Sequence, residues 1–373
     1  MKTREANNKH KDVFAAQCRC HVFDFCPWIF TSSCGWFRVA AAALLFAVIC
    51  RSAPLPAAEE GGADAFAVNG RLGRGVNIIG YDPIWRSKGR ARFKAQYFRA
   101  IKDAGFSTVR INLHPFRHMD ADNDFALRDS WWQVLDWALE HALRADLMAI
   151  LDLHEFGAMG NDPEGNKDKF LAFWRQVSRR LEEAPDNVLF EILNEPSRKL
   201  SAEMWNRYFR EALAVIRRTN PTRTVIIGPP HYNSIGHLGE LDLPADDRHI
   251  ILTVHYYSPM EFTHQGASWS SHKDKLGVEW KGTDKEKAAV ERDFESAEAW
   301  ARRNDRPVFL GEFGVYDKAA MESRVRYLDY VTRAMEKRRW SWAYWQFDSD
   351  FILYDIGKDK WVEPVLKALI PQP

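Results

Sequence analysis

Cysteine is missing from most of this sequence. All five cysteines lie in the first fifty of its 373 residues, at Cys18, Cys20, Cys26, Cys34 and Cys50. The rest of the chain cannot form disulfides, so we expect its stability to come from a hydrophobic core, which a chain of this length can build.

Charge of one sign is also lacking. The 52 Lys and Arg residues balance 51 Asp and Glu residues, and the formal net charge is +1. Nucleic-acid binding requires a clustered basic surface, so this balance gives no support for a nucleic-acid partner. Aromatic residues, by contrast, are abundant, with 15 Trp, 23 Phe and 11 Tyr. Many must pack in a core, but a sugar-binding groove would also use them, because sugar rings present flat apolar faces to aromatic planes.

The apolar run at Val39–Cys50 is too short to cross a membrane, since a bilayer core of about 30 Å needs roughly 20 residues in a helix. Its length is typical of a signal peptide, and the small residues Ala57 and Ala58 follow it. We therefore expect a leader over residues 1–58, a linker over 59–70 and a single domain over 71–373. The mature chain would be exported, to the periplasm or outside the cell, with no stable membrane span after cleavage.

A glycine-rich phosphate loop is absent after the first strand-like segment, which argues against an open nucleotide-binding sheet. Strand-like apolar runs occur at Gly75–Ile79, Thr108–Leu113, Leu147–Leu153, Val188–Leu193, Thr224–Ile227, Ile250–His255, Pro307–Gly311 and Ser341–Gln346. Helical patterns lie between most of them, at Ala91–Ala104, Ser130–Arg144, Lys167–Glu183, Ala202–Arg218, Lys285–Arg303 and Met321–Arg338. This alternation predicts an α/β fold, a closed (β/α)8 TIM barrel forming a single catalytic domain.

Two of the predicted strands end in a glutamate followed by a chain-breaking residue. The strings are Asn194-Glu195-Pro196 and Gly311-Glu312-Phe313-Gly314. Taken singly, each glutamate could be an ordinary polar strand cap. Together, at the rim of a buried core, they supply the two carboxyl groups that glycoside hydrolysis needs.

Polar, titratable or aromatic residues also stand at the ends of other predicted strands, where the active site of a (β/α)8 barrel lies. They are Asn77, Arg110, Asn112, His154, His255, Tyr257 and Trp345. Any one of them has an ordinary structural interpretation, such as a core histidine or a packed tryptophan. An ordinary structural role would have to apply to the residues of many strands at once, so we predict that these residues together form an active site.

These strings resemble glycosyl hydrolase family 5, whose members are retaining β-glycanases with (β/α)8 barrels and include many endoglucanases. Asn194-Glu195-Pro196 resembles the acid/base motif of that family, and the string around Glu312 resembles its nucleophile motif. The remaining family positions are matched by Arg110 in Val-Arg-Ile, His154 in Asp-Leu-His, His255 and Tyr257 in His-Tyr-Tyr, and Trp345 in Tyr-Trp-Gln. The resemblance covers residues 70–350. One departure is Glu155-Phe156 after His154, where many members carry a second aromatic residue or histidine.

The resemblance and the charges together imply a role for each residue. Glu312 would attack as an ionised nucleophile, held so by Arg110 and Tyr257. Glu195 would begin protonated, with its pKa raised by the charge of Glu312 and by partial burial. Asn194 would bind the sugar 2-hydroxyl. His154 and His255 would position hydroxyls and the acid/base, and Trp345 would form a stacking floor.

Candidate subsite residues are Asn77, at the end of the first predicted strand, and His264, Trp269 and Trp280, in the long segment 258–283. Long connections are usually functional or disordered. The tryptophans could form sugar subsites or be partly buried residues of a surface loop, and the sequence does not favour either interpretation.

The predicted function is that of an endo-β-1,4-glucanase, a monomer acting on cellulose-like or mixed-linkage β-glucan. A β-mannanase, β-1,3-glucanase or xyloglucanase would share the same catalytic residues, and a non-catalytic glycan-binding protein could keep the scaffold. The zinc motif His-Glu-x-x-His is absent. We therefore expect no metal ligand and no organic cofactor.

Overall fold

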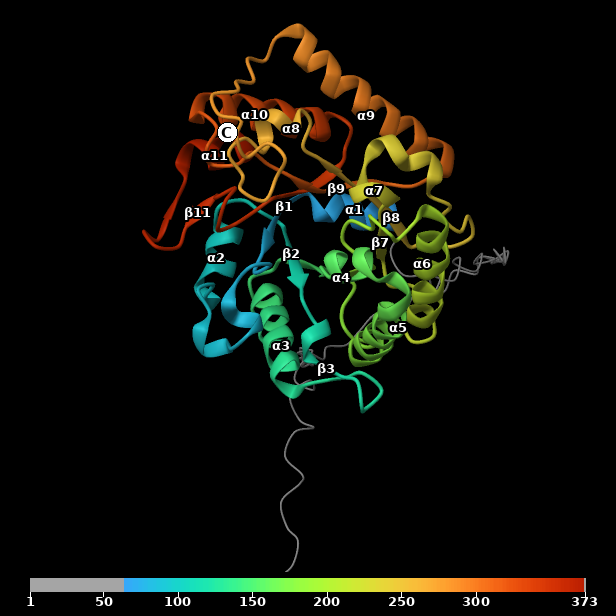
Figure 1. Ribbon diagram of the computed structural model, residues 1–373. Helices are drawn as coiled ribbons and strands as arrows, with labels where there is room; N and C mark the ends of the chain where they lie inside the picture. The colour runs from blue at the N-terminus through green and yellow to red at the C-terminus, as the bar shows by residue number, and fades with distance from the viewer. Residues whose placement is uncertain (1–63, 372–373) are drawn as a thin grey trace, which may run out of the picture. The chain divides into compact units, whose positions relative to one another are not determined.

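Eight parallel strands close into a barrel in a computed structural model that describes residues 64–371 (Figure 1). They are β1 (Arg74–Ile78), β2 (Thr108–Leu113), β5 (Met148–Leu153), β6 (Val188–Glu191), β7 (Val225–Ile227), β8 (Ile250–Tyr256), β9 (Val308–Phe313) and β10 (Ser341–Tyr344). The last strand pairs with the first, with Gly75 opposite Ala343, and this closes the barrel. The predicted (β/α)8 barrel is confirmed. The expected leader over 1–58 lies outside the described residues.

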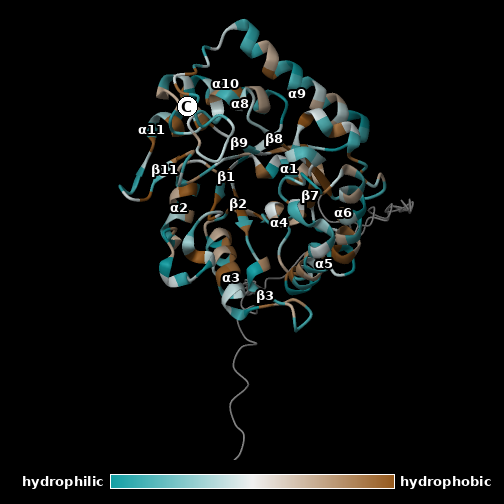
Figure 2. Cartoon of the chain, in the orientation of Figure 1, coloured by the Kyte–Doolittle hydropathy of each residue, from teal (hydrophilic) through white to brown (hydrophobic). Residues whose placement is uncertain are grey.

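Long helices surround the strands: α2 (Ala95–Asp103), α3 (Asp129–Arg144), α5 (Pro163–Arg180), α6 (Ala202–Arg217), α9 (Asp284–Asn304) and α10 (Met321–Lys337). Each has one apolar face, as α9 shows by burying Val290, Phe294, Ala297, Trp300 and Ala301. In Figure 2 this helix alternates between teal and brown along its length. The predicted bounds of these helices are close, but α5 begins earlier because Asp162 caps it and Pro163 occupies its first position.

Shorter elements connect the strands and helices. The helical turns are η1 (Pro83–Trp85), η2 (Lys88–Arg90), η3 (Phe116–His118), α4 (Phe156–Asn161), α7 (Pro230–Asn233), η4 (Ile235–Glu240), α8 (Met260–Thr263) and α11 (Glu363–Leu369). Two small hairpins are β3 (Met119–Asp120) with β4 (Ala126–Leu127), and β11 (Tyr354–Asp355) with β12 (Lys360–Trp361). In the part of the chain that the structure describes, no helix is long and apolar enough to cross a membrane.

A helix closes the barrel interior at the start of the described chain. Helix α1 (Ala65–Leu72) buries Ala65, Val68 and Leu72 in an apolar cluster with residues of the barrel strands. The strand residues of this cluster are Met148, Ile150, Leu189, Ile226, Ile251, Phe309 and Ala343. Asn69 on the same helix donates to the Val308 carbonyl and accepts from the Ser341 hydroxyl. The linker predicted over 59–70 is therefore wrong from residue 65 on.

Candidate active site

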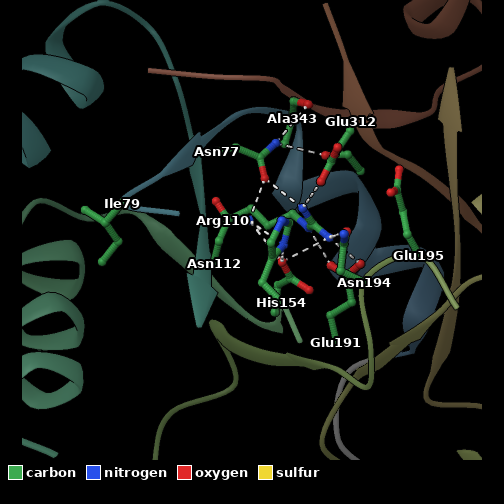
Figure 3. A network of polar contacts seen from close by, with 12 residues as sticks. Asn77, Ile79, Arg110, Asn112, His154, Glu191, Asn194, Glu195, Glu312 and Ala343 are labelled. Atoms are coloured by element: carbon green, nitrogen blue, oxygen red, sulfur yellow. Dashed lines mark hydrogen bonds and ion pairs between the residues drawn. The ribbon is translucent and has the colours of Figure 1, made fainter. Parts of the chain in front are cut away.

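Arg110 occupies the centre of the polar network at the carboxyl ends of the strands (Figure 3). Its side chain comes from β2 and is fully buried. The guanidinium makes a bidentate pair with Glu191, with Nε at 2.7 Å and Nη2 at 2.8 Å from the carboxylate oxygens. Nη1 donates to Glu312 at 2.8 Å, and Nη2 donates to the Asn194 side-chain oxygen at 2.8 Å. A buried cation is tolerated only when it is paired in this way.

Two further acids complete the surroundings of Arg110, and sequence reasoning missed both. Glu191 lies inside β6 and Asp152 inside β5, with Asp152 at 3.2 Å from the guanidinium. Burial alone would lower the pKa of Arg110, but these two carboxylates hold it well above its ordinary value. The signal that could have found them is an acidic residue in the middle of an apolar strand run.

Glu312 lies on β9 and accepts hydrogen bonds on both carboxylate oxygens. Arg110 donates to Oε1, and the Tyr257 hydroxyl donates to Oε2 at 3.0 Å. The two predicted contacts are confirmed. Burial nevertheless raises the pKa of Glu312 to about 7, against the opposing effects of His255 and Arg110. Burial thus opposes the effect predicted for Arg110 and Tyr257, which favour the ionised form of Glu312.

Glu195 follows β6 in a left-handed backbone conformation, with φ of 45°. Its Oε1 lies 2.8 Å from His255 Nδ1. Burial raises the pKa of Glu195 to about 8, with Arg110 opposing and Asp152 and Glu191 adding to the rise. Both the raised pKa and burial as a cause agree with the prediction, and Asp152 and Glu191 are two further acids that raise this pKa.

His255 connects the two glutamates. Its Nδ1 lies 3.6 Å from Glu312 Oε2, and one donor atom from each of the three side chains lies within 4.8 Å of the others. The buried Asn233 amide donates to Nε2 at 3.2 Å, so Nδ1 carries the proton that points at Glu195. Gly311 allows this close approach, because a Cβ there would lie 3.0 Å from His255 Nε2.

His154 and Trp345 stack with their rings nearly parallel. Their ring centroids are 5.4 Å apart at an interplanar angle of 9°. Asp152 accepts from His154 Nδ1 at 2.6 Å and so fixes the imidazole. The exposed Tyr81, which sequence reasoning missed, lies edge-on to Trp345 with centroids 6.0 Å apart. Tyr81 thus stands beside Trp345, the residue predicted to stack beneath the sugar ring.

The structure separates the candidate subsite residues. Trp269 is 59% exposed, whereas Trp280 is 1% exposed and packs against Tyr327. Asn77 is fully buried, with its oxygen accepting from Arg110. The prediction that Trp280 and Asn77 contact sugar is therefore wrong. Trp280 is a core residue, and Asn77 supports Arg110. His264 is buried and packs against Tyr257 and Trp269, so it supports these two side chains.

A polar cavity of about 320 Å³ adjoins His154 and is lined by His114, Phe116, Arg117, Glu155, Ala158, Asn166 and Lys169. His114 contacts His154 edge-on, with centroids 5.4 Å apart. Glu155 accepts from the Phe116 backbone N–H, so it shapes this cavity. Phe156, the other residue of the departure Glu155-Phe156, packs edge-on against His154, with ring centroids 5.3 Å apart.

A family model described as cellulase (glycosyl hydrolase family 5) matches residues 71–350. The chain belongs to glycosyl hydrolase family 5. It is a glycoside hydrolase of the cellulase-like kind, and the predicted resemblance to this family is confirmed.

Relatives of this family 5 enzyme agree with that assignment. Endoglucanase H of Acetivibrio thermocellus is 32% identical over 329 residues, which cover 84% of this chain but only 34% of the relative. The crystal structure of endoglucanase Cel5A from Thermotoga maritima is 40% identical with a TM-score of 0.79, covering 83% of this chain and 100% of that chain. A Cel5A structure with mannotriose is 39% identical with a TM-score of 0.78, covering 82% and 100%.

Proposed function

We propose that this family 5 enzyme is a retaining endo-β-1,4-glucanase that acts on cellulose-like or mixed-linkage glucans by double displacement. The observation that carries the proposal is the spacing of Glu195 and Glu312, which bring one carboxylate oxygen each within 4.8 Å. Retaining glycosidases hold their carboxyl groups about 5–5.5 Å apart, whereas inverting ones leave about 6.5–9.5 Å for a water molecule. The short spacing favours direct attack on the sugar by one carboxylate.

In the first displacement, an ionised Glu312 oxygen forms a bond to the anomeric carbon. The bond from that carbon to the glycosidic oxygen breaks, and the oxygen takes the proton of Glu195. Arg110 and Tyr257 hold the Glu312 carboxylate by a hydrogen bond to each oxygen, so its direction of attack is fixed. The hydrogen bonds from Arg110 and Tyr257 favour ionised Glu312, and the raised pKa of the buried Glu195 favours its protonated form, so this distribution of the proton is supported.

In the second displacement, Glu195 takes a proton from a water molecule, and the water oxygen attacks the anomeric carbon. The bond between that carbon and Glu312 breaks, which releases the sugar with its original configuration. His255 positions Glu195 for both transfers through the 2.8 Å contact with Nδ1. Asn194 accepts from Arg110 through its oxygen, so its amide nitrogen is the group that faces the 2-hydroxyl.

The choice of β-1,4-glucan as substrate rests on the relatives, which are named endoglucanases, and on the exposed aromatic side chains of the site. Mannan is the main competing substrate, because the Cel5A relative has been solved with mannotriose as well. A β-1,3-glucanase or a xyloglucanase would use the same two glutamates. Initial rates on barley β-glucan, carboxymethyl cellulose, mannan, laminarin and xyloglucan would distinguish these activities. A preference for mannan would overturn the glucanase assignment and leave the chemistry intact.

Glu195→Gln and Glu312→Gln test the chemistry, because each keeps the size of the side chain and removes only its acid or nucleophile. We expect each to lower the rate on barley β-glucan at least about 100-fold with the fold unchanged. Near parental rates in either variant would exclude the assignment of that glutamate. No release of reducing sugar by the parent protein would instead favour a glycan-binding protein. Azide should restore turnover of Glu312→Gly as the inverted glycosyl azide. With an activated aryl glycoside, azide should give the retained product in the Glu195 variant, so product stereochemistry separates the two roles.

We also propose that the enzyme is exported, which rests on the apolar run Val39–Cys50 and the small residues after it. The polysaccharides that it would cleave are too large to enter a cell, so export suits the substrate. The test is to express the full chain, separate the cell fractions and sequence the N-terminus of the active protein. A start near residue 59 is expected, and an uncleaved cytoplasmic protein would contradict the proposal.

A further inference from the structure

A second cluster of metal-ligating side chains lies on the loop that follows β7. His231 belongs to α7, and His237 and Glu240 belong to η4. One donor atom from each of the three lies within 4.8 Å of the others. The two imidazole rings have centroids 4.0 Å apart. None of the three takes part in the chemistry described above.

We propose that His231, His237 and Glu240 form a binding site for one divalent transition-metal ion of the Zn²⁺ type. Two imidazole nitrogens and one carboxylate oxygen are the donor set that such ions prefer over Ca²⁺ or Mg²⁺, which favour oxygen ligands. No metal site was expected from the sequence, because the motif His-Glu-x-x-His is absent and these three residues have the different spacing His-x5-His-x2-Glu. The fold of the loop brings the three side chains together.

The distances between the donor atoms suit a tetrahedral ion. Donors about 2.1 Å from such an ion lie about 3.4 Å from one another. Glu240 Oε2 lies 3.5 Å from His231 Nε2, and Glu240 Oε1 lies 2.7 Å from His237 Nδ1. A small rotation of the His237 ring away from its present hydrogen bond would make room for the ion. The side chains are half-exposed, so the ion can enter from solvent and a water molecule can take the fourth position.

The backbone on both sides of the cluster is held in place, which limits the entropy lost on binding. Asn233, two residues after His231, is fully buried and bonded to His255. Beside His237, the buried Leu238 anchors η4, and the Glu240 carbonyl accepts from the Asn206 side chain at 2.8 Å. Among the described residues, the Glu240 carboxylate forms ion pairs only with the two histidines. Its charge is therefore available to a cation.

The catalytic trio offers a competing set of donors, since Glu195, His255 and Glu312 also lie within 4.8 Å of one another. There, however, the Arg110 guanidinium donates to Glu312 at 2.8 Å, and its positive charge opposes a second cation. Within residues 64–371, no Lys or Arg forms an ion pair with the Glu240 carboxylate of the loop cluster. We infer that the loop cluster binds the ion more tightly.

The experiment is a titration of the full chain, without a polyhistidine tag, with Co²⁺ followed by visible absorption and then by displacement with Zn²⁺. The test variants are His231→Ala, His237→Ala and Glu240→Gln, and the matched controls are His272→Ala and Glu195→Gln. His272 is a partly exposed histidine of the loop between β8 and α9. Circular dichroism establishes that each variant is folded.

Removing a residue that hydrogen-bonds to a metal ligand typically lowers metal affinity about 10–100-fold. Removing a ligand itself should therefore weaken Co²⁺ binding at least about tenfold. We expect this loss in all three test variants and parental affinity in both controls. Parental binding in His237→Ala and Glu240→Gln would overturn the proposal. Loss of binding in Glu195→Gln alone would also overturn it, since the ion would then belong to the catalytic trio.

Discussion

At the scale of single residues, the site depends on a buried charge balance around Arg110. Glu191, Asp152 and Glu312 surround one guanidinium, so the network carries excess negative charge. That excess helps to keep a proton on Glu195, whose pKa burial, Asp152 and Glu191 all raise. Glu191 therefore influences catalysis through Glu195, although it touches Arg110 rather than substrate.

Glu191→Gln should shift the basic limb of the pH–rate profile to lower pH. Removing this negative charge makes ionised Glu195 less unfavourable, so the pKa of Glu195 falls. The measurement is kcat/KM on a soluble glucan from pH 4 to 10. Glu336→Gln, which alters an ion pair with Arg74 on the outside of the barrel, is the control and should leave the limb unmoved. An unmoved limb in Glu191→Gln would show that the charge does not act on Glu195.

Much of this residue-level picture could be predicted from the sequence, because the motif residues stand where strands stop. Arg110, Tyr257 and His255 were all expected near the glutamates, and the structure places them there. Glu191 and Asp152 could not be placed in the same way. An acid inside an apolar run looks like an ordinary strand residue until the barrel closes and turns it inward.

At the scale of elements, periodicity gave the strands and long helices to within a few residues, because a fully buried strand has an unbroken apolar run. Helix α1 was missed because its segment is short and includes Asn69 and Gly70, which are typical of loops. The side chains that it buries have partners only inside the closed barrel. Tertiary packing, rather than local propensity, makes this segment a helix.

Leu72→Ala should destabilise the protein by about 2–5 kcal/mol, because it opens a cavity where the helix meets the barrel interior. Phe66→Ala on the same helix is the matched control, since Phe66 is exposed and its loss should change stability by less than about 0.5 kcal/mol. Urea unfolding measures both. Equal effects of the two substitutions would mean that α1 does not seal the interior.

The loop between β8 and α9 gives a second paired comparison. Trp280→Ala should cost about 3–5 kcal/mol of stability because the ring is buried against Tyr327. Trp269→Ala should leave stability nearly unchanged and raise KM for a long glucan up to about tenfold, the value of one aromatic contact. An unchanged KM in Trp269→Ala would remove this residue from the substrate cleft. Thermal unfolding and kinetics on the same samples separate the two effects.

At the scale of the whole molecule, burial of the catalytic carboxyl groups favours activity but lowers stability at high pH. Burial raises the folded-state pKa of Glu195 to about 8 from an ordinary value of 4.5. A group whose pKa is raised by folding favours the folded state below its unfolded pKa, and this contribution is lost as the pH rises through the folded pKa. Glu312, with a pKa of about 7, acts in the same direction. Burial thus keeps the catalytic proton on Glu195 at neutral pH, and the same burial lowers the stability of the folded protein at alkaline pH.

Glu195→Gln should therefore become more stable than the parent as the pH rises. The amide cannot ionise, and its oxygen can still accept from His255 Nδ1, so the variant avoids the cost of burying a carboxylate. At pH 4.5 the two proteins should unfold at similar temperatures. Between about pH 5 and 8 the difference should grow, to a few kcal/mol, because each unit of pKa shift is worth about 1.4 kcal/mol. A difference that stays constant with pH would show that Glu195 has an ordinary pKa in the free enzyme. The proton needed for catalysis would then have to be supplied by substrate binding, which expels water from the cleft and raises the pKa only in the complex.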